Sequence, residues 1–437
     1  MPEAACITPT DPITSMNAPR PLMSLDEALE RLVAVASRQV IHEVESVSTF
    51  DALGRVLAED VSSALDVPPA DNTSMDGYAL RVADVPAAGT VLPQSQRIPA
   101  GAVGQPLLPG TVARIFTGAQ LPPGADAIVM QEQAQALEDG RVRIDTVPQP
   151  GQWIRRRGED ILNGSTVLAR GRRLSPQALG LAASVGRAEL RVLRRPRVAV
   201  FSTGDELVMP GQPLKPGAIY NSNRYTLRGL LQAAGCEVQD LGIVPDRLEA
   251  TRAALRAAAL HNDLIVTSGG VSVGEEDHLR PAMQAEGRLD LWQIAMKPGK
   301  PLAFGAVRRP NVLGGAAPDG SSGEALFVGL PGNPVSSWVT CLVAVLPLLR
   351  ALQGMPAAAL PSLAARADFD WPRPDRRREF LRARFNADGG LELFANQSSG
   401  VLTSAAWADG LVDNPAGQAI ARGDTVRFLP LANLSAF

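Results

Sequence analysis

Hydrophobic and polar positions alternate with different periods along the chain, and the period changes near residue 198. Beyond it, short apolar runs such as Val198–Phe201 and Leu264–Val266 predict buried strands, while residues 223–234 carry leucines at helical spacing. Regular alternation of strand and helix is typical of a parallel sheet covered on both faces. Residues 195–353 are therefore predicted to form a doubly wound α/β domain with a parallel sheet.

Helical signals are fewer before this region. Ser24 to Glu27 form a capping box that opens an amphipathic helix, and Ser175-Pro176 open another helix that ends at Gly186. A shorter helical stretch is predicted at residues 51–59. We expect the first and last of these helices to pack together, which predicts a helical linker domain. Its two parts are residues 21–62 and residues 161–194.

Two other regions predict β structure. Residues 63–160 are rich in Gly and Pro and contain short β-type runs, such as Ile115–Ala119 and Ala125–Met130, so we expect a β domain inserted into the helical one. Residues 355–437 alternate apolar and polar positions and predict a C-terminal β-barrel. Residues 1–20 are expected to be a disordered tail. Residues 308–324, rich in Gly, are expected to be a flexible hairpin insertion.

Composition restricts the class of protein. A chain of 437 residues is expected to fold as about two to four domains. Its net charge of −3 argues against bulk nucleic-acid binding, and we expect no membrane span, which needs roughly 20 consecutive apolar residues. Cys6, Cys236 and Cys341 are not clustered, which argues against a disulfide framework or a zinc site and favours a cytoplasmic protein.

The stretch after the strand Leu264–Val266 carries the strongest chemical signal. It contains small residues at Ser268, Gly269, Gly270, Ser272 and Gly274, followed by the carboxylates Glu275, Glu276 and Asp277. Glycines allow backbone N–H groups to turn toward an anion, and carboxylates beside them suggest a phosphate ester bound with a hard divalent cation. The alternative is a Gly-rich turn before an acidic helix start. No Gly-Lys-Ser/Thr follows, so this is not a Walker loop.

Further polar residues follow the other predicted strands of this domain. They are Asp205 and Glu206, Asp246, Lys297 and Lys300, and Pro331 with Asn333. Carboxyl ends of parallel strands share the edge of the sheet where ligands bind, so these residues are expected in one pocket. The chain has three lysines, Lys215, Lys297 and Lys300, and the last two share one short run, which favours a binding role over a merely charged turn.

Two polar segments outside the α/β domain leave alternatives open. Residues 71–78 read Asp-Asn-Thr-Ser-Met-Asp-Gly-Tyr and form either a binding loop or a plain turn. Arg155, Arg156 and Arg157 precede two carboxylates. These arginines either form a solvated face or clamp an oxyanion.

Together the motifs resemble a known family, the bacterial molybdopterin molybdenumtransferases, which are related to the C-terminal part of gephyrin. The resemblance covers about residues 20–430. It rests on residues 71–78, 155–160, 202–206, 267–277, 297–301, 329–334 and 397–404. The run Ser-Gly-Gly-Val-Ser-Val-Gly alone is also found in the smaller molybdopterin adenylyltransferases.

The resemblance implies a four-domain homodimer whose site lies between the α/β domain of one subunit and the β domain of the other. It implies a reaction in which adenylylated molybdopterin and molybdate give molybdenum cofactor and AMP, with Mg²⁺. It also suggests a molybdopterin adenylyltransferase and molybdoenzyme apoproteins as partners.

The resemblance also implies roles for individual residues. The expected metal ligands are Glu206, Asp246 and Asp277, which together with Asp76, Lys297 and Lys300 make up the expected catalytic set. The residues expected to face molybdate are Lys297, Lys300, Arg377 and Ser399. The residues expected to bind the pterin substrate are Thr117, Arg155, Ser268, Gly269, Gly270, Ser272, Gly274, Pro331 and Asn333. Asp76, Thr117 and Arg155 would reach across the dimer, and Gln293 stands where some members carry a lysine.

The physical chemistry of the residues agrees with this reaction. Breaking a phosphoanhydride calls for Mg²⁺ held by carboxylates, and a tetrahedral dianion suits Lys, Arg and hydroxyl donors. One alternative is a molybdopterin adenylyltransferase, which would not need residues 20–190 or 355–437. Another is a non-catalytic gephyrin-like scaffold, against which the intact carboxylates and lysines argue.

Overall fold

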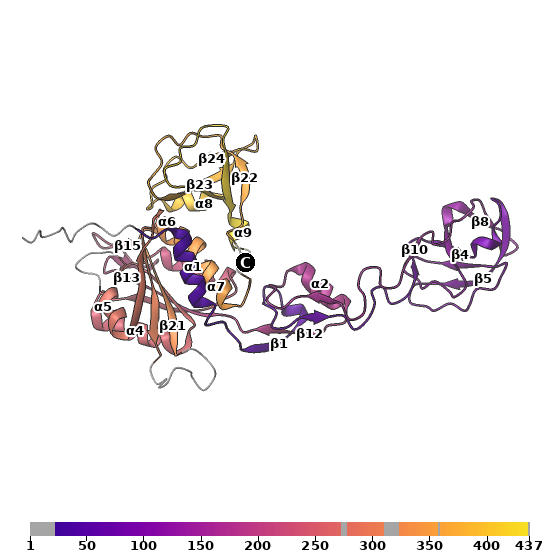
Figure 1. The fold of residues 1–437 in the computed structure, drawn as a ribbon, viewed down its shortest axis with the longest axis horizontal. Helices are drawn as coiled ribbons and strands as arrows, with labels where there is room; N and C mark the ends of the chain where they lie inside the picture. The colour runs from indigo at the N-terminus through magenta and orange to yellow at the C-terminus, as the bar shows by residue number, and fades with distance from the viewer. Residues whose placement is uncertain (1–21, 272–277, 310–322, 357–358, 436–437) are drawn as a thin grey trace, which may run out of the picture. The chain divides into compact units, whose positions relative to one another are not determined.

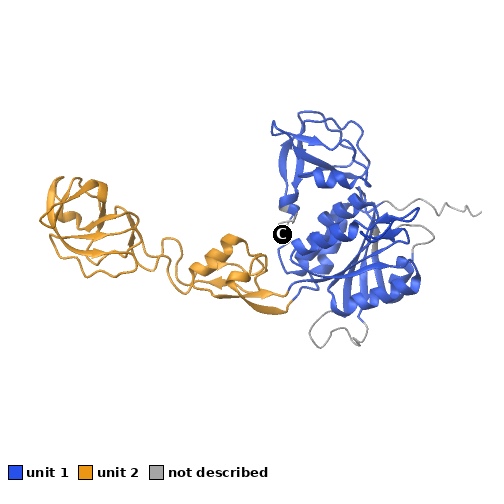
Figure 2. Cartoon of the chain, turned by 180° about the vertical axis from the view of Figure 1, so that it is seen from behind, with its two compact units in different colours: residues 1–41, 195–437 blue, residues 42–194 orange. Residues whose placement is uncertain are grey.

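The computed structural model describes residues 22–271, 278–309, 323–356 and 359–435. Residues 42–194 form one compact unit, and the rest of the chain forms the other (Figure 2). Each unit has its own hydrophobic cores.

The larger unit is built on a six-stranded sheet in the order β16-β13-β17-β21-β20-β18 (Figure 1). Its strands are β13 (Arg197–Thr203), β16 (Glu237–Val244), β17 (Leu264–Ser268), β18 (Gly287–Gln293), β20 (Pro301–Arg308) and β21 (Glu324–Leu330). The first four strands of that order run parallel, and β20 is antiparallel to both of its neighbours. The start of β20 therefore lies at the edge where the parallel strands end.

Helices cover both faces of this sheet, which confirms the doubly wound α/β fold. One face packs against α1 (Leu25–Ala36), α3 (Asn223–Ala233), α6 (Pro334–Thr340) and α7 (Leu346–Leu352). The other face packs against α4 (Leu248–His261) and α5 (Leu279–Glu286). Strand β13 shows why: Val198 and Val200 belong to the first core, and Ala199 and Phe201 belong to the second.

A π-helical segment, Cys341–Val345, joins α6 to α7. Pro347, in the first turn of α7, lacks an N–H and would clash with the carbonyl four residues earlier, which accounts for the widened turn. The whole run Pro334–Leu352 is long and apolar enough to cross a membrane, but 89% of its most hydrophobic window is buried inside the protein.

The first helix corrects one sequence expectation. We predicted that it packs on the later helix of the linker region, but α1 packs against α7 and buries Leu25, Ala28 and Leu32 in the α/β core. An amphipathic stripe specifies that a helix has a partner, and it does not specify which one.

The C-terminal region is a small barrel. Its strands are β19 (Met296–Lys297), β22 (Leu363–Arg366), β23 (Arg378–Phe385), β24 (Leu391–Leu393), β25 (Gly410–Asn414) and β26 (Thr425–Pro430), with the helices α8 (Leu402–Trp407) and α9 (Leu431–Ser435). The pairing runs β23-β25-β26-β22, β24 pairs with β23, and a bridge from Ala367 to Leu391 closes the ring. The predicted barrel is therefore confirmed.

One short strand of the barrel comes from the part of the sequence that was predicted to belong to the α/β domain. We expected a strand of the α/β sheet to end at Lys297, but β18 ends at Gln293, and Met296–Lys297 pairs with β23 of the barrel. This pairing aligns Lys297 with Glu379.

The smaller unit contains a six-stranded sheet in the order β7-β4-β6-β5-β9-β8. Its strands are β4 (Gly77–Leu80), β5 (Thr90–Ile98), β6 (Val112–Ile115), β7 (Ala127–Met130), β8 (Ala134–Ala136) and β9 (Arg141–Ile144). Strand β6 ends at Ile115, earlier than predicted, because the chain turns there and Gly118 donates to the Thr73 carbonyl.

The remainder of the smaller unit is less helical than predicted. Helix α2 (Pro176–Ser184) packs with the strand pairs β1–β12 (Val44–Ser48 and Glu189–Leu193) and β2–β11 (Val61–Ser62 and Thr166–Leu168). The expected helix at residues 51–59 is absent from this described stretch, where a 3-10 turn ends at Asp51. Gly54, with φ of 72°, turns the chain there.

Candidate functional site

One cavity of about 1060 Å³ collects most of the residues singled out in the sequence. It lies in the larger unit, at the edge where the parallel strands end, and the barrel forms part of its wall. Its walls include Glu206, Asp246, Ser268, Gly269, Gly270, Lys297, Lys300, Pro331, Asn333, Arg377 and Ser399. Three predicted residues, Ser272, Gly274 and Asp277, lie outside the described residues, and Asp76, Thr117 and Arg155 belong to the other unit.

The turn after β17 requires glycine. Gly269 and Gly270 have φ angles of 88° and 64°, in the left-handed region. A Cβ at Gly269 would lie 2.5 Å from the Thr203 carbonyl oxygen, so two strand ends meet closely here. The Gly269 N–H donates to the Leu330 carbonyl at 3.1 Å, so it serves the fold and not a bound anion.

Carboxylates form one end of the cavity. Glu206 follows β13, and its carboxylate lies against Gly204, where a Cβ would be 2.6 Å from Oε2. Asp246 follows β16, and its N–H donates to Asp205 Oδ1 at 3.3 Å, which links the two loops. Among the described residues no three His, Cys, Asp or Glu side chains gather as a metal site. Two carboxylates suffice for Mg²⁺ when substrate phosphate and water complete its octahedron, so this pair fits that ion.

Cations form the other end, and two carboxylates, the half-buried Asp375 and the buried Glu379, hold them. Lys297 Nζ lies 3.2 Å from Glu379 Oε1 and 3.4 Å from Asp375 Oδ2. Arg377 donates to both oxygens of Asp375 at 2.9 Å. The hydrogen bonds from Arg377 hold the pKa of Asp375 well below its usual range. Lys300 lines the same cavity and is exposed.

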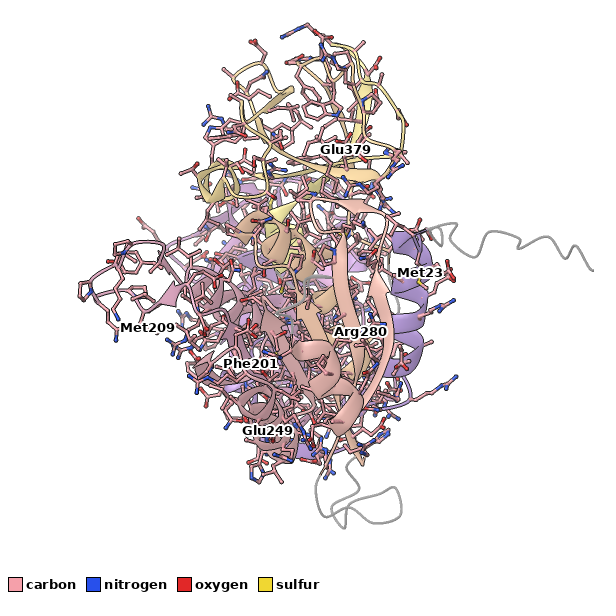
Figure 3. The ribbon with its side chains drawn as sticks, turned by 90° about the vertical axis from the view of Figure 1, so that its left-hand side faces the viewer. Met23, Phe201, Met209, Glu249, Arg280 and Glu379 are labelled. Carbon is pink, nitrogen blue, oxygen red and sulfur yellow. The ribbon has the colours of Figure 1, made fainter. Side chains whose placement is uncertain are left out.

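Glu379 connects Lys297 to the barrel, and Figure 3 shows it at the base of the barrel. It is fully buried, and its second carboxylate oxygen accepts from Trp371 Nε1 at 2.9 Å and from the Asp375 N–H at 3.0 Å. Sequence reasoning missed the roles of Asp375 and Trp371. The close sequence spacing of Asp375, Arg377 and Glu379 was the available signal, since oppositely charged side chains a few residues apart can pair.

Two further cavity residues were missed because they look like ordinary strand and turn residues. Thr203 and Asn221 are 4% and 2% exposed, yet Thr203 Oγ1 and Asn221 Nδ2 have no hydrogen-bond partner among the described residues. Asn221 Oδ1 accepts from the Arg224 N–H at 3.2 Å, which fixes the amide orientation. Buried polar groups are normally satisfied, so these two atoms are available to hydrogen-bond a ligand or water in the cavity.

The predicted residues of the smaller unit surround one segment. Asp76 Oδ1 accepts from Thr117 Oγ1 at 2.6 Å and from the Thr117 N–H at 2.7 Å, and these two bonds lower the pKa of Asp76. Arg155 lies on β10 (Ile154–Arg155), which pairs with β3 (Asn72–Thr73). The segment 72–76 is therefore bound both to Thr117 and to the strand that carries Arg155.

The run of three arginines is divided in its roles. Arg156 Nη1 donates to Asp71 Oδ2 at 2.7 Å, and Arg157 Nε donates to Asp66 Oδ2 at 2.5 Å. These two guanidiniums brace loops of the unit. Arg155 is exposed and makes no ion pair with the described residues. Of the three, it is therefore the one suited to bind an oxyanion.

A cavity with carboxylates at one end and held cations at the other, at the carboxyl edge of a doubly wound sheet, defines a binder of anionic, phosphate-bearing small molecules. Three family models cover most of the chain: "MoeA N-terminal region (domain I and II)" at residues 23–186, "Probable molybdopterin binding domain" at 199–351 and "MoeA C-terminal region (domain IV)" at 364–431. The chain belongs to the molybdopterin molybdenumtransferase family, which confirms the resemblance seen in the sequence.

Individual relatives support this membership. The chain is 38% identical over 375 residues to the molybdopterin molybdenumtransferase of Haemophilus influenzae, covering 85% of this chain and 89% of that protein. It is 31% identical over 420 residues to gephyrin of Dictyostelium discoideum, covering 87% of this chain and 57% of gephyrin. A solved molybdopterin biosynthesis moeA protein from Pyrococcus horikoshii, 31% identical, matches with a TM-score of 0.72 over 94% of this chain and 99% of that one.

Proposed function

We propose that this protein is a molybdopterin molybdenumtransferase, which inserts molybdate into adenylylated molybdopterin and releases AMP to form molybdenum cofactor. One observation carries the proposal: Glu206 and Asp246 share a single cavity with Lys297, Lys300 and Arg377. A substrate with an anhydride at one end and a molybdate acceptor at the other needs both kinds of group in one pocket.

The carboxylate end would act on the phosphoanhydride. Glu206 and Asp246 would hold Mg²⁺, and Asp277 is proposed as the third ligand. When bound, Mg²⁺ offsets the negative charge of the phosphates as the anhydride bond breaks and AMP leaves. Thr203 Oγ1 and Asn221 Nδ2 would hydrogen-bond the ligand, which would satisfy two buried polar atoms.

The cationic end would hold molybdate. Lys297, Lys300 and Arg377 carry positive charge, and the Ser399 hydroxyl adds a neutral donor beside them. Asp375 and Glu379 fix Lys297 and Arg377 in place before the substrate arrives, so little ordering is left for the binding step. The remaining predicted contacts, Ser268 to Gly270, Ser272, Gly274, Pro331 and Asn333, would line the pterin phosphate.

The proposed assembly is a homodimer in which Asp76, Thr117 and Arg155 of one subunit complete the cavity of the other. A cytoplasmic location is proposed because Cys236 and Cys341 are free thiols buried in the core. A molybdopterin adenylyltransferase and molybdoenzyme apoproteins are the proposed partners before and after this reaction.

The test is AMP release from adenylylated molybdopterin with Mg²⁺, with and without molybdate. Release that depends on molybdate is expected. AMP release without molybdate dependence, or consumption of ATP with molybdopterin, would favour an adenylyltransferase. No turnover at all in a folded dimer would favour a scaffold.

Subunit mixing tests the shared site. Asp76→Ala and Asp246→Asn dimers are each expected to be inactive. After subunit exchange, half of the dimers are hybrids with one intact site, so about a quarter of the wild-type activity should return. No recovery, with exchange verified by mass spectrometry, would show that the sites are not shared.

A further inference from the structure

A buried arginine in the barrel has no acidic partner within the described part of the chain. Arg382, on β23, is 1% exposed, and its guanidinium donates only to neutral oxygens. They are Ser404 Oγ at 3.1 Å, the Phe380 carbonyl at 3.0 Å and the Ser398 carbonyl at 3.4 Å. No carboxylate among the described residues forms an ion pair with it.

A buried charge of this kind is costly to keep. Desolvation lowers the pKa of Arg382 to about 10, so the group still carries its charge near neutral pH. Taking a charge out of water carries a large free-energy cost, and no opposite charge among the described residues offsets that cost here, so stability alone does not account for an arginine at this position. Positions where a sequence departs from the usual rules of folding, such as the rule that buried charges are paired, are commonly functional.

Arg382 binds one loop through both its guanidinium and its backbone, while its other two guanidinium bonds go to α8 and to its own strand. Besides the bond to Ser398, the backbone N–H of Arg382 donates to Gln397 Oε1 at 2.9 Å, and its carbonyl accepts from Gln397 Nε2 at 2.9 Å. Residues 397–400 are the part of this loop that lines the main cavity.

The other side of the loop is tied to the α/β domain. The Ser399 carbonyl accepts from the Val335 N–H, at the start of α6, at 3.0 Å. Two adjacent carbonyls, of Ser398 and Ser399, are thus bound from opposite sides, which fixes the backbone that carries the Ser399 hydroxyl. A second cavity of about 300 Å³, lined by Arg382, Lys297 and Gln397 among others, adjoins this loop.

We propose that Arg382 is a positioning residue for molybdate: it holds residues 397–400 so that Ser399 faces the oxyanion, and it adds a positive charge with which no carboxylate among the described residues forms an ion pair. This inference rests on the proposed function, because it takes molybdate as the anion bound there. The adenylylated pterin, bound toward the carboxylate end, does not depend on Arg382.

The test compares three variants in the full-length protein. Arg382→Met removes charge and hydrogen bonds, and Arg382→Lys keeps the charge. Arg384→Met is the matched control, because Arg384 is on the same strand but is exposed and paired with Glu392. We expect Arg382→Met to raise the KM for molybdate about tenfold or more, with kcat and the KM for adenylylated molybdopterin nearly unchanged. Arg382→Lys should show a smaller rise, and Arg384→Met none.

Amide hydrogen exchange separates positioning from general damage. Arg382→Met should speed exchange in residues 397–401 and leave β25 and β26 protected. A molybdate KM within twofold of wild type, or an equal rise in the KM of both substrates, would overturn the proposal. If Arg382→Met does not fold, Ser404→Ala replaces it in the test, because it removes one acceptor of the guanidinium. We then expect a smaller rise in the KM for molybdate and the same faster exchange in residues 397–401.

Calorimetric titration with molybdate alone distinguishes this inference from the proposed function. Molybdate binding that weakens in Arg382→Met supports the inference even if wild-type protein releases no AMP. Normal AMP release with binding unaffected by Arg382→Met overturns the inference and leaves the function standing. Wild-type protein that binds no molybdate overturns both.

Discussion

The two ends of the cavity are built in different ways. At the carboxylate end, the exposed Glu206 and the half-buried Asp246 lie on loops after sheet strands. At the cationic end, Lys297 and Arg377 are already neutralised by Asp375 and the buried Glu379. The carboxylate end supplies two acidic side chains, which are the ligands that a hard cation prefers. At the cationic end, Lys297 and Arg377 are paired within the protein, and Lys300 is exposed.

This difference bears on what each end does with its ligand. Carboxylate oxygens are the ligands that a divalent ion such as Mg²⁺ prefers, so the carboxylate end is suited to recruit one. Cations that are paired in advance attract an oxyanion less strongly, but their geometry is fixed. The protein therefore gains affinity at one end and preorganisation at the other.

The largest expected effect comes from the carboxylate end. Asp246→Asn removes one charge with little change in shape, and we expect AMP release to fall about 100-fold or more because the anhydride step loses a metal ligand. Thermal unfolding should be unchanged. Glu249→Gln serves as the control, since Glu249 is an exposed carboxylate in the first turn of α4. Equal activity of the two variants would remove Asp246 from the proposed site.

The sequence predicted the carboxylate end better than the cationic end, for a physical reason. Strand–helix alternation fixes which residues follow strand ends, so Glu206, Asp246 and Asn333 could be assigned to one edge without knowing any contact. The partners of Lys297 lie about 80 residues away in another domain, and no local period encodes that pairing.

The same reasoning explains the errors. Helix α1 has a clear apolar face, but the apolar surface of several other elements could pack against it, so its neighbour was predicted wrongly. The strand Met296–Lys297 is too short to show a hydrophobic periodicity, so its place in the barrel sheet could not be predicted from the sequence. The unsatisfied atoms of Thr203 and Asn221 exist only in the folded chain.

A second prediction addresses the cationic end. Glu379→Gln keeps the shape but leaves Lys297 with weaker support, so we expect the KM for molybdate to rise severalfold and the free energy of unfolding to fall by about 2 kcal/mol. Urea unfolding and steady-state kinetics measure the two effects. Arg384→Met, which breaks an exposed ion pair, should change neither. A large loss of kcat with no change in molybdate KM would contradict the assigned role.

The third prediction concerns the glycine turn at the sheet edge. Gly269→Ala brings a Cβ to 2.5 Å from the Thr203 carbonyl oxygen. Gly211→Ala is the control, because Gly211 has a similar φ of 92° and a Cβ there has no neighbouring atom within 4 Å. Both substitutions carry the strain of a left-handed alanine, about 1 kcal/mol, and only Gly269→Ala adds a steric clash. We expect Gly269→Ala to lower the unfolding free energy by about 2 kcal/mol more, as measured by urea unfolding. Equal losses would mean that the turn relaxes.

The smallest effect is a pH dependence at the cationic end. Arg377 holds the pKa of Asp375 below its unfolded value, so the carboxylate stabilises the fold above that unfolded value and loses this contribution as the pH falls through the folded pKa. Between about pH 5 and 8, Asp375→Asn should therefore cost a constant amount of unfolding free energy relative to wild type, and below about pH 4 the difference should shrink. Urea titrations at several pH values measure it. A difference that instead grows with acid would mean that Asp375 is not held by Arg377 in solution, and that Arg377 is not paired before its ligand arrives.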